Sequence, residues 1–356
     1  MVSGNAHQLL ASYLSNRLQY THVLGVDSTK LLIQYGVPQG SVLGPLLFLL
    51  YINDIINFSE LAKFILFADD TNIFVEDKCP VKVFKLANKI LQSIVNYMNC
   101  NKLHINMGKC CYIHFRPKTN SKTILAKLHT TELKLIINGE KIKQVEEAKF
   151  LGVIIDDKLS WKPHIAHLEN KLKCCTGILN LIKDNVPQSY HKSLYHTLFE
   201  SHLSYGITVW GGVPEASLKN LFLVQKKCIR ILFGNKDTYL EKYKTCVRTR
   251  PRHAQKLGAD FYMKENTKPL FKDNSILTIQ NLYCYHTLIL IFKALKFRSP
   301  YSLYSCFNLS NRKDTLIITP QASNNFVSNA SILWNKIRII LDIKDFPIVY
   351  VPSNQK

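Results

Sequence analysis

The order of apolar and polar residues predicts a chain that begins with mixed elements and continues as helices. An amphipathic helix is expected over residues 5–20, where apolar side chains recur three or four positions apart. Two short strand-like runs within 21–35 predict a hairpin that turns at Asp27–Ser28. Residues 46–52 form an uninterrupted apolar run after a stretch rich in glycine and proline, which favours a helix that starts at this turn.

The next apolar run is interrupted by two adjacent acids. Residues 64–75 place Phe, Ile and Val, which favour strands, on both sides of the sequence Ala-Asp-Asp-Thr-Asn. Because that sequence favours a tight turn, we expect a β-hairpin with Asp69 and Asp70 at its tip. Two carboxylates at one tip offer the hard oxygen ligands that Mg²⁺ prefers. The alternative is a solvated turn without a ligand.

Downstream, apolar residues return at helical spacing. The stripes predict helices over 81–99, 162–182, 189–203, 217–233 and 270–297, and a further packed helix around Trp334. An Asn-Gly turn at 138–139 predicts a small hairpin. In the helix over 217–233 we expect the basic side chains to face solvent, namely Lys219, Lys226, Lys227 and Arg230.

Charge narrows the choice of partner. The chain has 356 residues, a formal net charge of +21 and 47% apolar residues, so it can bury a core. A strongly basic balance suits nucleic acid, although a basic protein without such a partner is the alternative. Residues 158–256 carry 17 Lys/Arg and 6 Asp/Glu, whereas 1–157 carry 17 and 13. The middle block is therefore the better candidate for phosphate contacts.

The ten cysteines lack the spacing of a zinc site or of a secreted disulfide framework. They are interpreted as reduced thiols of an intracellular protein, nuclear or cytoplasmic. The N-terminus has no signal-peptide pattern, and no apolar run is long enough to span a bilayer, so no membrane contact is expected. No feature indicates a protein partner.

The glycine- and proline-rich turn carries its own candidate chemistry. Gly40 has no Cβ, so a ligand can approach the backbone closely. Pro45 suits a helix start, where free N–H groups favour phosphate. A glycine-rich turn into a helix is also an ordinary connection. Asp54, at the other end of this helix, is interpreted as a cap or turn residue rather than as a catalytic acid.

Two strings stand in order here: Gly36-Val37-Pro38-Gln39-Gly40-Ser41-Val42-Leu43-Gly44-Pro45-Leu46-Leu47-Phe48 and Phe67-Ala68-Asp69-Asp70. Together they resemble the palm of non-LTR retrotransposon reverse transcriptases, most closely the jockey-like group. The resemblance implies RNA-directed DNA synthesis, in which a primer 3′-hydroxyl attacks the α-phosphate of a deoxynucleotide with two Mg²⁺ ions. The implied partners are an RNA template, a DNA primer and deoxynucleotides.

The resemblance also assigns residues. It implies that Asp69 and Asp70 are catalytic and bind Mg²⁺, or Mn²⁺ in its place. It also implies that four residues bind the nucleotide and the template, namely Pro38, Gln39, Gly40 and Phe67.

Further along, Leu103, Asn106 and Lys109 match the family's Leu-x-x-Asn-x-x-Lys segment. Lys109 would act on the pyrophosphate leaving group, as a general acid or an electrostatic clamp; an exposed lysine in a turn is the alternative. Residues 148–161 resemble the primer-grip strand and turn, which implies that Leu151 and Gly152 contact the primer. The acidic pair that follows, at 156–157, is interpreted as a surface turn and not as a metal site.

These expectations define an α+β chain. Residues 1–157 would form a partial right-hand polymerase palm, an antiparallel sheet with packed helices. Residues 158–235 would form an α-helical thumb, since the strings Tyr205–Gly211 and Gln225–Arg230 resemble the thumb of the same group. Residues 236–356 would form a basic, mostly helical C-terminal region, with a basic linker or nucleic-acid contact over 236–260.

In the family, a third aspartate and the fingers stand upstream of the Pro-Gln-Gly turn. We therefore expect a fragment without fingers and without the first catalytic aspartate, with weak or no polymerase activity by itself, because positioning dominates phosphoryl-transfer catalysis. Three hypotheses stay open: a reverse transcriptase, a catalytically inactive nucleic-acid-binding remnant, and a fragment that does not fold stably.

Overall fold

The computed structural model describes residues 3–58, 61–115, 134–234, 267–310, 313–318 and 330–333. The chain divides into two compact units, one made of Met1–Tyr112 and Thr119–Gln144, the other of Ile113–Lys118 and Val145–Lys356. The basic segment expected over 236–260 and the helix expected around Trp334 lie outside the described residues.

The first unit mixes helices with short strands. In chain order its elements are α1 (Gly4–Leu14), β1 (Leu18–Gln19), β2 (His22–Val23), β3 (Val26–Asp27), β4 (Leu31–Leu32), α2 (Leu43–Ile52), the 3₁₀ helix η1 (Asn53–Phe58), β5 (Lys63–Phe67), β6 (Asp70–Phe74), α3 (Pro80–Cys100), the 3₁₀ helix η2 (Met107–Lys109), β7 (Cys111–Tyr112), β8 (Ile136–Ile137), β9 (Glu140–Lys141) and β10 (Lys143–Gln144). The helices expected at the start, at 46–52 and at 81–99 are all present, the first of them ending earlier than predicted.

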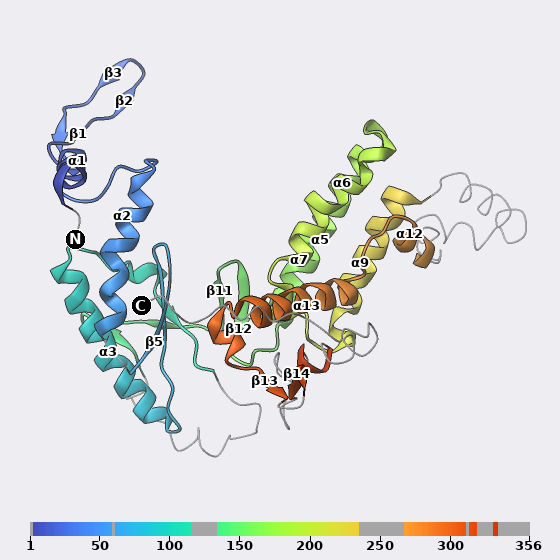
Figure 1. The fold of residues 1–356 in the computed structure, drawn as a ribbon. Coiled ribbons are helices and arrows are strands. Elements are labelled where there is room, and N and C mark those ends of the chain that lie inside the picture. Colours follow the sequence, from blue (N-terminus) through green and yellow to red (C-terminus); the bar gives the residue numbers. More distant parts are fainter. Residues whose placement is uncertain are drawn as a thin grey trace, which may run out of the picture. The chain divides into compact units, whose positions relative to one another are not determined.

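One core joins α2, η1, the β5–β6 hairpin and α3 of this unit. Ile52 and Ile55 from the end of α2 and from η1 pack against Ile90, Ile94 and Tyr97 of α3. The β5–β6 hairpin adds three side chains to the same cluster, Phe64, Leu66 and Ile73. Figure 1 shows α2, α3 and β5 beside one another, as this shared core requires. Helix α3 has 21 residues and is amphipathic, so its apolar stripe can pack against both α2 and the β5–β6 hairpin.

The first hairpin turns at a different place from the predicted one. β1 pairs with β4 and β2 with β3, all antiparallel, and the tip is Leu24–Gly25 rather than Asp27–Ser28. Leu24 and Gly25 have φ values of 49° and 82°, the left-handed pair that a two-residue hairpin turn requires and that glycine adopts readily. Asp27 instead lies in the ladder, where its carboxylate contacts His22.

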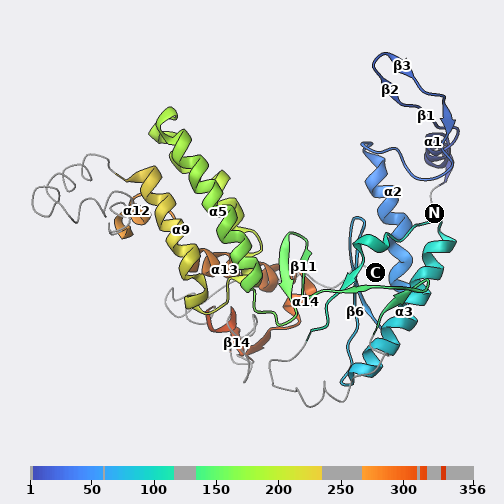
Figure 2. The same cartoon turned by 180° about the vertical axis from the view of Figure 1, so that it is seen from behind.

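The second unit is mainly helical. Its elements are β11 (Glu147–Phe150), β12 (Val153–Asp156), α5 (Lys162–Ile182), the 3₁₀ helices η3 (Lys183–Asn185) and η4 (Gln188–Tyr190), α6 (His191–Tyr195), the π-helix η5 (His196–Glu200), α7 (Ser201–Ser204), α8 (Ile207–Trp210), α9 (Glu215–Phe233), α12 (Lys268–Asp273), α13 (Ile279–Phe297), α14 (Tyr301–Tyr304), β13 (Asn308–Ser310) and β14 (Lys313–Ile318). The long helices α5 and α9 lie side by side (Figure 2).

A large cluster forms the main core of this unit, and a smaller one lies near the end of α13. The large cluster contains Leu172 and Leu179 of α5, Leu221 and Ile229 of α9, and Ile279 at the start of α13. Because α9 packs against α5, α12 and α13, its buried face is wider than one stripe. Arg230 is consequently buried, with 8% of its surface exposed, and the expectation that it faces solvent is wrong.

Across the described residues, strands pair only in twos. Antiparallel hairpins account for most of these pairs, and β7 with β10 is parallel. The chain is therefore a mixed helix and strand fold, as expected for α+β, whereas the detailed palm and thumb remain predictions.

Candidate functional site

The two adjacent aspartates lie where the turn signal predicted them. β5 and β6 pair antiparallel from Lys63 opposite Phe74 to Phe67 opposite Asp70, which leaves Ala68 and Asp69 as the two-residue loop. Ala68 has a φ of 50°, as a tight hairpin turn demands. Asp69 is thus at the tip and Asp70 is the first residue of the returning strand.

The hairpin has one buried and one open face. Phe64 and Leu66 point into the core, so the alternating positions, including Phe67 and Asp70, lie on the other face. Phe67 is 61% exposed there, and both aspartates are exposed. Among the described residues, neither carboxylate forms a hydrogen bond or an ion pair. Two free carboxylates on one tip have the oxygen ligands that suit a divalent cation, so the donor chemistry fits Mg²⁺ or Mn²⁺.

The Pro-Gln-Gly turn is organised around the Ser41 hydroxyl. It donates to the carbonyl oxygen of Pro38 at 2.7 Å and accepts from the N–H of Gly44 at 3.1 Å and from the Tyr13 hydroxyl at 2.6 Å. A Cβ on Gly44 would lie 3.0 Å from that Pro38 oxygen, so this turn needs a glycine at position 44. The turn therefore enters α2 in a fixed shape that is tied to α1.

The turn presents its middle to solvent. Gln39 and Gly40 are exposed and Pro38 is half-buried. Gly40 has a φ of 78°, and no atom lies within 4 Å of where its Cβ would be. This backbone is thus open to a ligand, as the sequence interpretation required. Turn and hairpin belong to the same unit, where Phe48 of α2 packs in the cluster that holds the hairpin.

Asp54 has a structural partner. Its carboxylate accepts a hydrogen bond of 2.6 Å from the hydroxyl of Tyr97, which also contacts the carbonyl oxygen of Tyr51 at 3.2 Å. Burial and this hydrogen bond raise the pKa of Tyr97 well above its ordinary value. Asp54 thus joins η1 to α3, which supports its interpretation as a residue of the fold.

Lys109 ends the 3₁₀ helix η2 and is exposed. Its backbone N–H donates to the carbonyl oxygen of Asn106 at 3.0 Å, which closes the turn. The first unit contains both Lys109 and the aspartate hairpin. The ammonium group is therefore available to a ligand.

The predicted primer-contact residues are part of the second unit. Leu151 and Gly152 form the tip of the β11–β12 hairpin, with φ values of 44° and 87°. The hydroxyl of Tyr205 donates a hydrogen bond of 2.6 Å to the carbonyl oxygen of Leu151. A Cβ on Gly152 would lie 3.0 Å from the Tyr205 ring, so glycine is needed here for packing within the chain as well as for the turn.

The string Tyr205–Gly212 connects this hairpin to the C-terminal helices. The Trp210 indole is fully buried and donates to the carbonyl oxygen of Tyr205 at 2.9 Å. Gly211 and Gly212 pack against Tyr283 of α13. A Cβ added to Gly211 would lie 2.8 Å from the Tyr283 side chain, and one added to Gly212 would lie 2.9 Å from it. The glycines of this motif therefore allow close packing, a role that sequence reasoning had not assigned.

Asp156 is a buried anchor. It ends β12, and its carboxylate accepts hydrogen bonds from the N–H groups of Ser160 and Trp161, each at 2.9 Å. Burial alone would raise the pKa of Asp156, but these hydrogen bonds lower it below its ordinary value. The side chain thus fixes the turn into α5. The expectation of a surface turn is wrong for Asp156, which is buried because it satisfies these backbone groups.

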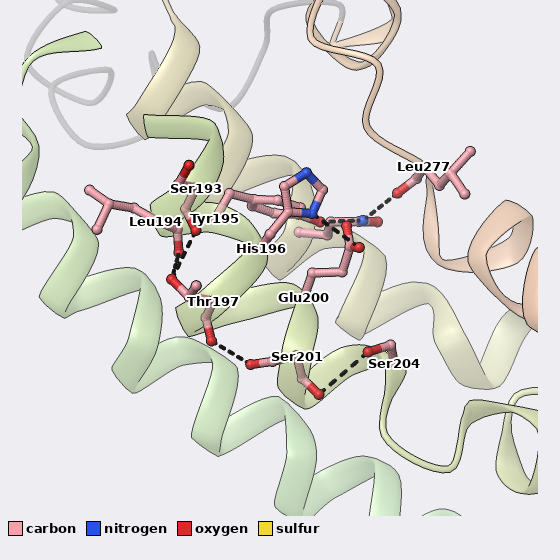
Figure 3. A network of polar contacts seen from close by, with 10 residues as sticks. Ser193, Leu194, Tyr195, His196, Thr197, Glu200, Ser201, Ser204 and Leu277 are labelled. Atoms are coloured by element: carbon pink, nitrogen blue, oxygen red, sulfur yellow. Dashed lines mark hydrogen bonds and ion pairs between the residues drawn. The ribbon is translucent and has the colours of Figure 1, made fainter. Parts of the chain in front are cut away.

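Gln225 links α9 to two other elements. Its amide nitrogen donates to the Tyr195 hydroxyl and to the Leu277 carbonyl, both at 2.9 Å, and its oxygen accepts from the N–H of Ile279 at 3.0 Å. Figure 3 shows the hydrogen bond to the Leu277 carbonyl oxygen. Nearby, the Thr197 hydroxyl donates to the Ser193 carbonyl oxygen, and the Ser201 hydroxyl donates to the Thr197 carbonyl oxygen. The Gln225–Arg230 string therefore contributes core contacts.

Within the described part of the chain, no three His, Cys, Asp or Glu side chains gather into a metal-ligating group. The nine cysteines there are free thiols. None of the helices in that part combines the length and apolar character that a bilayer crossing requires.

Comparison with known proteins identifies relatives. The sequence profile of the family described as reverse transcriptase (RNA-dependent DNA polymerase) matches residues 4–155. The RNA-directed DNA polymerase from mobile element jockey of Drosophila melanogaster is 23% identical over 236 residues, which cover 64% of this chain and 25% of that protein. The Drosophila funebris protein of the same name is 25% identical over 244 residues, with 66% and 26% covered.

A third relative comes from another element. The retrovirus-related Pol polyprotein from type-1 retrotransposable element R1 of Bradysia coprophila is 25% identical over 241 residues, which cover 64% of this chain and 22% of that protein. The chain spans about a quarter of the length of these relatives. No solved structure matches it. Residues 4–155 thus match the reverse transcriptase family, and the chain is homologous to the RNA-directed DNA polymerases of jockey and other non-LTR retrotransposons.

Proposed function

We propose that this chain acts in RNA-directed DNA synthesis, the transfer of a deoxynucleotide to a primer 3′-hydroxyl on an RNA template. The observation that carries the proposal is the β5–β6 hairpin, which leaves Asp69 and Asp70 exposed and unpaired within a domain that matches reverse transcriptases. These carboxylates would hold the divalent cation, Mg²⁺ or Mn²⁺. Such a cation stabilises the attacking and leaving oxygens of an in-line displacement.

The neighbouring residues have distinct tasks in this proposal. The open backbone at Gln39 and Gly40 would receive the nucleotide and the template, and Pro38 would hold the turn in shape through its bond from Ser41. The exposed ring of Phe67 lies on the same hairpin face as Asp70, where it could contact a sugar or a base. Lys109, exposed in the same unit, would stabilise the charge that develops on the pyrophosphate leaving group.

The second unit would hold the nucleic acid. In this proposal the primer backbone contacts the Leu151–Gly152 tip, which Tyr205 keeps in place. The exposed lysines Lys219 and Lys227 and the half-buried Lys226 of α9 would contact duplex phosphates without reading bases. The boundaries 1–157 for a palm and 158–235 for a thumb belong to the same proposal. Of the described residues after 266, Phe271, Ile276, Ile279 and Leu282 pack into the large core of the helical unit.

A second function is supported by the charge distribution. Residues 158–256 carry 17 Lys/Arg against 6 Asp/Glu, and phosphate binding by so basic a sequence needs no catalytic site. The chain would then bind RNA or DNA without turnover. Its binding would weaken steeply with added salt and would not depend on Asp69 or Asp70.

A primer-extension assay separates the two functions. The full chain is incubated with an RNA template, an annealed DNA primer, deoxynucleotides and Mg²⁺, and compared with Asp69→Asn and Asp70→Asn. Glu76→Gln, an exposed acid just beyond the same hairpin, is the matched control. Incorporation that is lost in both aspartate variants and kept in the control supports polymerisation. Absence of incorporation with salt-sensitive binding of the wild type contradicts it and supports the binding function.

A further inference from the structure

The end of α13 carries aromatic rings that face solvent. Phe297, its last residue, is 62% exposed, and Tyr301, the first residue of α14, is 72% exposed. The opposite side of this segment packs into a small core in which Ile291 and Ala294 contact Phe307. The segment that carries the exposed rings is therefore anchored by this small core.

Positive charges surround these rings. Lys293 and Phe297 are four residues apart on one helix face, and both are exposed. The Lys296 Nζ lies 5.4 Å from the centre of the Phe297 ring, and the Arg298 guanidinium lies 5.5 Å from the centre of the Tyr304 ring. The sequence from 274 to 313 contains no Asp or Glu. The cations of this surface thus have no acid nearby in sequence to neutralise them.

We propose that Lys293, Lys296, Phe297, Arg298 and Tyr301, here termed the α13–α14 cluster, bind an unpaired nucleic-acid strand. Bases would stack on the exposed rings, because every base has a π-face and stacking tolerates any sequence. The ammonium and guanidinium groups would contact the phosphates. In a duplex the base faces are stacked on one another. A duplex would therefore contact only the cationic side chains of the cluster and bind more weakly.

This inference goes beyond the proposed polymerase function, because the cluster needs neither a divalent cation nor a nucleotide. An acidic protein segment is the competing occupant. It would use the charges and leave the rings without a function, although Phe297 and Tyr301 are 62% and 72% exposed.

Fluorescence anisotropy with the full chain tests the proposal, without Mg²⁺ or deoxynucleotides. The labelled probes are a 15-mer of uridylate, a 15-mer of thymidylate and a 15-base-pair duplex. Phe297→Ala and Tyr301→Ala remove the rings, and the double variant Lys296→Gln/Arg298→Gln removes two charges. Tyr190→Ala, a tyrosine of similar exposure in the same unit, is the matched control. Unfolding curves confirm that the variants fold.

We expect each ring variant to weaken single-strand binding about tenfold, with little effect on the duplex. The charge variant should reduce the slope of log affinity against log salt concentration by about 0.7 for each lost phosphate contact. The tighter of the uridylate and thymidylate probes then assigns RNA or DNA as the bound strand. Unchanged affinity in the ring variants, an equal loss in Tyr190→Ala, or equally tight binding of a polyglutamate peptide would overturn the proposal.

Discussion

The hydroxyl of Tyr205 donates a hydrogen bond of 2.6 Å to the carbonyl oxygen of Leu151, 54 residues earlier in the chain. The Tyr205 ring also packs against Gly152. A Cβ added to Gly152 would lie 3.0 Å from the nearest atom of this ring. One tyrosine thus sets both the position of the hairpin tip and the residue that the tip can contain. The tip is the part of the helical unit that we propose contacts the primer.

Gly152→Ala should destabilise the second unit by about 1–3 kcal/mol, because it combines a strained positive φ with a clash. In a Tyr205→Ala background the clash is gone, so the same substitution should cost only the strain of the turn. Urea unfolding followed by tryptophan fluorescence measures both, since Trp161 and Trp210 belong to the second unit. Equal costs in the two backgrounds would show that the ring does not restrict this position.

Gln225→Leu should destabilise the same unit by about 2–4 kcal/mol. The amide is fully buried, and its loss leaves the Ile279 N–H and the Leu277 carbonyl without their partner. Asn220→Leu replaces an exposed amide on the same helix and serves as the control. The same fluorescence assay applies. A Gln225→Leu variant as stable as this control would contradict the structural role of the side chain.

Asp156 predicts an acid-sensitive contribution to stability. Its pKa is lowered in the folded chain, so the unfolded chain binds a proton more readily. The stabilisation is present above the ordinary aspartate value of about 3.9 and is lost as the pH falls through the lower folded value. Asp156→Asn should therefore be less stable than wild type at pH 7, with a difference that shrinks below about pH 4. Asp157→Asn is the adjacent control, and a constant difference at all pH values would contradict the assignment.

Asp54 should matter for the fold and not for the metal. Asp54→Leu removes the closer of the two acceptors of the buried Tyr97 hydroxyl and should cost about 1–3 kcal/mol, whereas Asp54→Asn keeps an acceptor there and should cost less. Hydrogen exchange over α3, measured by mass spectrometry, reports this because the first unit contains no tryptophan. Loss of Mn²⁺ binding in Asp54→Asn would instead make it a ligand.

Local signals in the sequence were sufficient for the elements of the candidate site. The Ala-Asp-Asp turn between β-prone runs predicted the β5–β6 hairpin, and the structure confirms it. The Asn-Gly signal likewise predicted the β8–β9 hairpin. In both cases, the turn residues and the alternation of apolar and polar side chains act over a few neighbouring residues. The local sequence is therefore sufficient to predict the hairpin.

Long-range contacts were beyond such reasoning. Nothing near Tyr205 indicates that its hydroxyl reaches Leu151, and nothing near Gln225 indicates a bond to Leu277. The expected single helix over 270–297 is two helices, because Ser275 adopts a left-handed φ of 53° and Thr278 caps the second one. The positions of Gln39, Gly40 and Lys109 relative to a substrate stay predictions.

Mn²⁺ binding, followed by the loss of the free-ion EPR signal on titration with the full chain, tests the central claim most directly. It requires neither template nor turnover, and the comparison with the aspartate variant isolates the contribution of the tip. We predict binding by the wild type and by Glu76→Gln, and its loss in Asp69→Asn/Asp70→Asn. Binding of equal strength in the double aspartate variant would contradict the assignment of this hairpin as the metal site.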